Sequence, residues 1–195
     1  SHGKLLTSHI RDEGDTVEES LREMLDIARE TGVRLEICHL KAQGKHNFYK
    51  MDALFEQLDA ARRDGVDVTF DVYPYTKLNT LLTALLPVWA QDGGVSGMVD
   101  RMKDAQSAAR ILAQIEPIAN RYGGWENIVV ASCSEEKNRW CEGLSLAEIG
   151  EKEGLIPAKA YIRLMIDDNC GVMAVCNCLD EENLQRALRH PLGML

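Results

Sequence analysis

Three apolar stretches decide the fold: LLTSHI (5–10), VRLEICHL (33–40) and VDVTFDVY (66–73). Each is short, rich in aliphatic and β-branched residues, and ends in polar or titratable side chains, which is typical of buried strands. The two segments between them repeat apolar residues at helical spacing and end at Gly32 and Gly65. Strands that alternate with helices of this length form right-handed βαβ units with parallel strands. The first 80 residues are therefore predicted to be α/β.

The first of these helices begins near Asp15, which is followed three residues later by Glu18, a pair typical of a capping box. Its apolar stripe runs from Val17 to Ala28, and the stripe of the second helix runs from Met51 to Ala61, after a loop at 42–49.

Beyond Pro87 the pattern becomes mostly helical. We expect helices over 95–122 (two of them), 145–153, 158–168 and 181–189, the last capped by Asp180, and short strands over 127–132 and 171–177. The sequence thus predicts a division into an α/β segment, 1–90, and a mostly helical segment, 91–195.

Charge and composition limit the possible partners. The net charge is −9, with 31 acidic against 22 basic residues, and no basic stripe is interleaved with aromatic residues, which argues against nucleic acid. No apolar run approaches the roughly 20 residues of a membrane span, so membrane insertion is not expected. The six cysteines lack the spacing of a disulfide framework and suggest reduced thiols in a cytoplasmic protein. Ser1-His2 resembles a cloning remnant.

Polar side chains follow the C-terminal ends of all three predicted strands, where α/β folds place their active sites. His9 and His39 lie 30 residues apart, one strand-helix repeat, so their imidazoles should be neighbours, as a zinc site requires. Each alone could be a structural histidine; the pair in this setting favours a metal site. Lys41, one pleat beyond His39, could hold an anionic substrate group, or else lie at the surface or pair with a carboxylate such as Asp71. Tyr73 could donate a hydrogen bond to a substrate or merely pack against its neighbours.

These residues carry a family resemblance. The blocks TSHIRDE (7–13), ICHLKA (37–42) and DVYPY (71–75) are similar, in order and spacing, to three successive blocks of the N-acyl-D-amino-acid deacylases, or D-aminoacylases, of the amidohydrolase superfamily. Looser similarity extends over most of the chain. The resemblance implies a partial TIM-type (β/α) barrel, with about three parallel barrel strands and their helices, followed by the mostly helical segment.

The resemblance also implies roles for individual residues. His9 and His39 would be zinc ligands from the fifth and sixth barrel strands, and Lys41 and Tyr73 would contact the carboxylate or carbonyl region of an N-acyl amino acid. Asn79 stands where the family has a substrate-binding serine, which puts the preferred D-amino acid in question.

Three family elements have no counterpart here: a His-x-His pair, a bridging cysteine, and the general-base aspartate, which we expect beyond Leu195. The chain is therefore interpreted as an inactive internal fragment of a zinc-dependent amidohydrolase whose exposed barrel edges would permit oligomers. Two alternatives stay open: a dihydroorotase- or hydantoinase-like cyclic amidase, and a purely structural, non-catalytic fragment.

Overall fold

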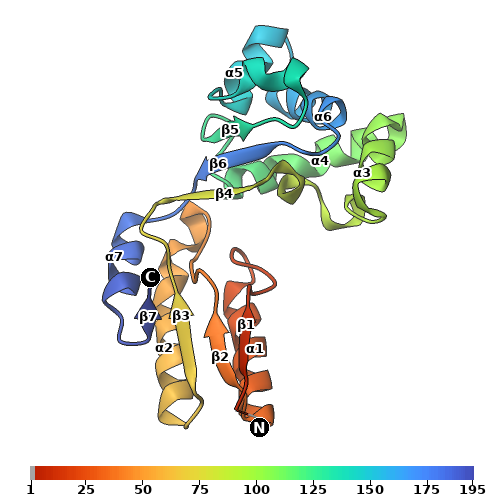
Figure 1. Ribbon diagram of the computed structural model, residues 1–195. Helices are drawn as coiled ribbons and strands as arrows, with labels where there is room; N and C mark the ends of the chain where they lie inside the picture. The colour runs from red at the N-terminus through yellow and green to blue at the C-terminus, as the bar shows by residue number, and fades with distance from the viewer. Residues whose placement is uncertain (1–2) are drawn as a thin grey trace. The chain divides into compact units, whose positions relative to one another are not determined.

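The computed structural model describes residues 3–195, so Ser1 and His2 lie outside the described residues. The chain forms two compact units (Figure 1). The first comprises the described residues up to Thr76 together with Leu179–Leu195, and the second comprises Lys77–Cys178. The division at residue 90 expected from the sequence stays a prediction.

The first unit is built on a parallel sheet. Its strands are β1 (Leu5–Ser8), β2 (Arg34–Ile37), β3 (Val68–Asp71) and the two-residue β7 (Gly193–Met194), and its helices are α1 (Val17–Thr31), α2 (Met51–Arg63) and α7 (Glu181–Arg189), with a 3-10 helix at Lys45–Lys50. The strand order is β1-β2-β3-β7, and all neighbours are parallel. The βαβ prediction is confirmed, whereas the strands of residues 3–195 form no closed barrel.

The two faces of this sheet differ in chemistry. Leu35, Ile37 and Val68 on one face are buried in a single core together with Leu21 of α1 and Leu58 of α2. Strand side chains alternate between faces, so the intervening residues point the other way.

The opposite face is polar. Thr7, Glu36 and Thr69 lie in register across it, and the Thr69 hydroxyl donates to Glu36 Oε2 at 2.5 Å. The helices thus cover one side of the sheet, and the other side presents hydrogen-bonding groups.

Helix ends follow the expected caps with one exception. Gly32 ends α1 in the left-handed region at φ 65°, and Asp180 accepts from the Asn183 backbone N–H at 2.9 Å to cap α7. The predicted Asp15–Glu18 capping box is wrong. The N-cap of α1 is Thr16, without a side-chain cap, because the Asp15 carboxylate instead accepts from His46 and the Asn47 side chain, at 2.8 and 3.0 Å.

The second unit combines an antiparallel sheet with helices. Its strands are β4 (Lys77–Leu81), β5 (Ile128–Ser132) and β6 (Met173–Asn177) in the order β4-β6-β5, and its α-helices are α3 (Gly94–Lys103), α4 (Ala105–Arg121), α5 (Leu146–Glu153) and α6 (Pro157–Asp167). The helices expected in this part of the chain are present, and the two expected strands correspond to β5 and β6; β4 was not predicted. No helix among the described residues is long and apolar enough to cross a membrane.

Candidate metal centre

The first three strands deliver their following residues to one edge of the parallel sheet. Ser8 lies in register with Ile37, and Ile37 with Phe70. The chain leaves β1, β2 and β3 within one or two residues of these positions. His9 follows β1 directly and His39 follows β2 by two residues, so both enter loops at the C-terminal edge.

At this edge the two imidazoles meet. His9 Nδ1 lies 3.2 Å from His39 Nε2, and the ring centroids are 4.7 Å apart. The side chain of His9 is 61% exposed and that of His39 is 33% exposed, so a ligand could reach both. The expectation that adjacent parallel strands place both rings on one side of the sheet is confirmed.

The backbone at His39 is unusual, because its φ is +39°, in the left-handed region that non-glycine residues rarely occupy. Three hydrogen bonds hold it there: Cys38 N–H donates to the Ser8 carbonyl at 2.9 Å, His39 N–H to Asp71 Oδ1 at 2.5 Å, and Leu40 N–H to the Asp71 carbonyl at 2.9 Å. Such strain is kept where the surroundings enforce it, often at functional sites.

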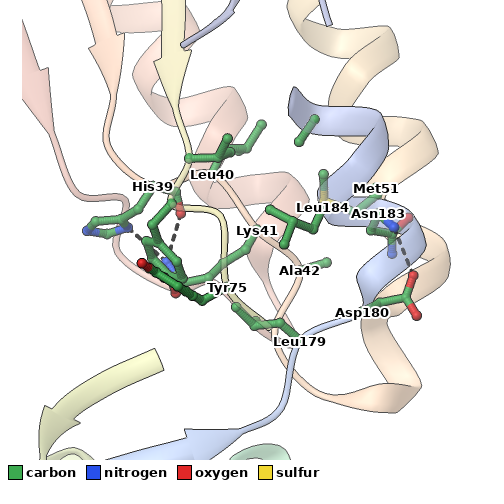
Figure 2. A pocket seen from close by; sticks show the side chains of 13 residues that line it. His39, Leu40, Lys41, Ala42, Met51, Tyr75, Leu179, Asp180, Asn183 and Leu184 are labelled. Carbon is green, nitrogen blue, oxygen red and sulfur yellow. Dashed lines mark hydrogen bonds between the residues drawn. The ribbon is translucent and has the colours of Figure 1, made fainter. Parts of the chain in front are cut away.

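Lys41 was expected one pleat beyond His39 on an extended strand. This expectation is wrong, because β2 ends at Ile37 and the chain turns at His39. Lys41 nevertheless returns to His39. Its ammonium donates to the His39 carbonyl at 2.7 Å and lies 2.8 Å from His39 Nδ1 (Figure 2). Lys41 also forms an ion pair with a carboxylate, as one alternative allowed. The partner is Glu13, at 2.5 Å, and not Asp71.

Glu13 also belongs to the site, although the sequence analysis assigned it no role. It lies in the charged stretch 11–13 after β1, a composition that is also typical of a solvent-exposed loop. Its Oε1 lies 2.8 Å from His39 Nδ1 and 3.3 Å from His9 Nδ1, with 11% of the side chain exposed. Burial pushes the pKa of this carboxyl upward, but the hydrogen bond with His39 and the charge of Lys41 outweigh burial and lower it below its ordinary value. The available indication was its position at the end of the TSHIRDE block (7–13), in the loop that follows His9.

Tyr73 and Asn79 are placed differently. The Tyr73 ring lies 6.5 Å from the His39 ring, and Lys41 Nζ lies 5.4 Å from its centroid. Asn79 is exposed on β4 of the second unit, opposite Val175, and is not part of the group that the first unit brings together.

A pocket adjoins this group within the first unit. Figure 2 shows His39 and Lys41 on one side of it and Leu184 and Asn183 of α7 on the other. Apolar side chains such as Met51 line the space between them. The polar cluster therefore borders a largely apolar recess.

The donor set suits a zinc ion. His9, Glu13 and His39 offer ligand atoms within 4.8 Å of one another. Two nitrogens that each lie about 2.05 Å from one tetrahedral zinc are about 3.3 Å apart, and His9 Nδ1 and His39 Nε2 are 3.2 Å apart. His9 and His39 are therefore close enough to hold a single zinc ion together.

Comparison with known proteins confirms the family resemblance, although no protein-family model matches. The chain is 29% identical over all 195 residues to an N-acyl-D-glutamate deacylase of Alcaligenes xylosoxydans xylosoxydans, of which it covers 31%. Over 82 residues, 42% of this chain, it is 35% identical to a D-aminoacylase of the same organism, covering 17% of that protein.

A solved structure agrees. The N-acyl-D-glutamate deacylase of Bordetella bronchiseptica, complexed with zinc and a phosphonate inhibitor, matches 98% of this chain with a TM-score of 0.71 and 26% identity. The match covers 32% of that protein, so the chain spans about a third of the length of its relatives.

Proposed function

We propose that this chain is part of a zinc-dependent amidohydrolase that hydrolyses the amide bond of N-acyl-D-amino acids. One observation carries the proposal: His9 Nδ1 and His39 Nε2 lie 3.2 Å apart at the C-terminal edge of a parallel sheet. The chain that holds them is similar over its whole length to an N-acyl-D-glutamate deacylase, and a related deacylase is complexed with zinc.

The residues then take distinct roles. His9 and His39 hold the metal, which, when bound, lowers the pKa of a water molecule so that hydroxide is available near neutral pH. Lys41 binds the substrate carboxylate through its ammonium, which lies at this edge beside His39 and is ion-paired with Glu13. Tyr73, beside Lys41, donates a hydrogen bond to the substrate.

The sheet is proposed to be part of a TIM-type barrel in the parent protein. Helices cover one face and polar residues lie in register on the other, as expected of an outer ring and a barrel interior. β7 lies parallel to β3, so a residue that follows β7 would emerge at the edge that holds His9 and His39. The general-base aspartate is proposed to come from there, and the 195-residue chain alone to be inactive.

Substrate assays on the parent protein test the proposal. Zinc-loaded parent protein is expected to hydrolyse N-acetyl-D-glutamate or another N-acetyl-D-amino acid in preference to the L-enantiomer, and to leave dihydroorotate and hydantoins intact. The 195-residue chain is expected to hydrolyse none of them, because the general-base aspartate is proposed to come from outside it. Turnover of the cyclic amides by the parent would favour the cyclic amidase, and no turnover of either class would favour a non-catalytic role.

A further inference from the structure

We propose that Glu13 is a positioning residue that fixes the tautomer of His39 against the opposing influence of Lys41. This inference rests on the proposed function, because the tautomer matters only if His39 binds a metal. Glu13 Oε1 and Lys41 Nζ each lie 2.8 Å from the same atom, His39 Nδ1, while His39 Nε2 faces His9.

The two neighbours of Nδ1 favour opposite tautomers. A carboxylate oxygen can only accept, so Glu13 stabilises a proton on Nδ1 and leaves the lone pair on Nε2. An ammonium can only donate, so Lys41 stabilises a lone pair on Nδ1 and a proton on Nε2. Only the first tautomer can bind a metal through Nε2, because the bond uses that lone pair.

The geometry favours Glu13. The Lys41 ammonium already has two oxygen acceptors, Glu13 Oε1 at 2.5 Å and the His39 carbonyl at 2.7 Å. The Nδ1–H tautomer therefore leaves both Lys41 contacts to oxygen in place. The Nε2–H tautomer would instead set the Nδ1 lone pair against a carboxylate 2.8 Å away.

The position of Glu13 is itself secured. Its backbone carbonyl accepts from Gln43 N–H at 2.7 Å, which ties the loop after β1 to the loop that follows His39. With 11% of its side chain exposed, the carboxylate has little freedom to turn away. Glu13 thus acts through His39, as carboxylates beside metal-bound histidines commonly do.

Zinc affinity of the 195-residue chain and of the parent protein, measured by competition with a chelator, tests this role. Glu13→Ala is expected to weaken zinc binding about 10- to 100-fold, the range for residues that orient a ligand. Glu13→Gln keeps an acceptor and should lose less. Adding Lys41→Met to Glu13→Ala removes the opposing donor and should recover most of the loss. The matched control is Glu23→Ala, which removes an exposed glutamate of α1 that pairs with Arg11, and it should leave zinc affinity unchanged.

Nitrogen-15 NMR of the imidazoles without zinc gives a readout independent of metal and activity. His39 should be protonated on Nδ1 in the unchanged chain and largely on Nε2 in Glu13→Ala. An unchanged tautomer with an affinity within twofold would refute the role of Glu13 while leaving the proposed function intact. Loss of binding as complete as in His39→Ala would mean that Glu13 is a ligand. If neither protein binds zinc, the proposed function fails, and the tautomer comparison still decides on Glu13.

Discussion

Replacing Lys41 by alanine in the proposed parent enzyme should raise KM and leave kcat nearly unchanged. The Lys41 side chain is 11% exposed, and its ammonium is held beside His39 within 2.7 Å of two oxygen atoms, Glu13 Oε1 and the His39 carbonyl. We propose that it binds the substrate carboxylate, a group that does not change during cleavage of the acyl amide. Binding lost equally from ground state and transition state affects KM alone.

The size of the effect follows from the type of contact. A hydrogen bond to a charged group contributes about 1.5–3 kcal/mol, which corresponds to an increase of about 10- to 150-fold in KM at 1.4 kcal/mol per factor of ten. Steady-state kinetics with N-acetyl-D-glutamate measure it, and Lys45→Ala, at an exposed position of the next 3-10 helix, is the control. A fall in kcat by orders of magnitude at unchanged KM would contradict this role and show that Lys41 acts on the reacting carbonyl or the metal.

Three further predictions concern the chain itself. Folding lowers the pKa of Glu13, so its ionised carboxylate stabilises the fold above pH 4.5, the ordinary pKa, and this stabilisation is lost as the pH falls below that value. Glu13→Gln should therefore flatten the acid side of a plot of Tm against pH. Burial raises the pKa of Cys133 to about 12, so mass spectrometry after iodoacetamide treatment at pH 8 should find it unmodified in the folded chain, with the half-buried Cys38 reacting first. Ser145→Ala removes the capping box with Glu148 at the start of α5 and should cost about 1 kcal/mol in urea unfolding; an unchanged midpoint would contradict it.

Local patterns were enough to predict much of the first unit. The strands and helices around His9 and His39 depend on short-range periodicity, and the spacing of 30 residues follows from one strand-helix repeat. β4 escaped prediction because it is defined by pairing with β6, far along the chain, and only Leu78 within it is buried. Its assignment required a long-range contact that no local pattern encodes.

The site itself was only half predictable. The histidine pair follows from strand order, but Glu13 becomes a partner of His39 only because the chain turns at His39, where φ is +39°, and brings Lys41 back beside it. That turn depends on hydrogen bonds from the Asp71 region, which the sequence of 37–42 does not reveal. The Asp15 cap failed for a similar reason, since a distant loop recruits its carboxylate.

The proposed function depends on a metal ion that His9 and His39 hold together. Its most direct test is anomalous X-ray diffraction at the zinc edge from crystals of the zinc-loaded parent protein. An anomalous peak is expected about 2.0–2.1 Å from both His9 Nδ1 and His39 Nε2. Full zinc loading with the peak elsewhere, and the two imidazoles still hydrogen-bonded to each other, would contradict it.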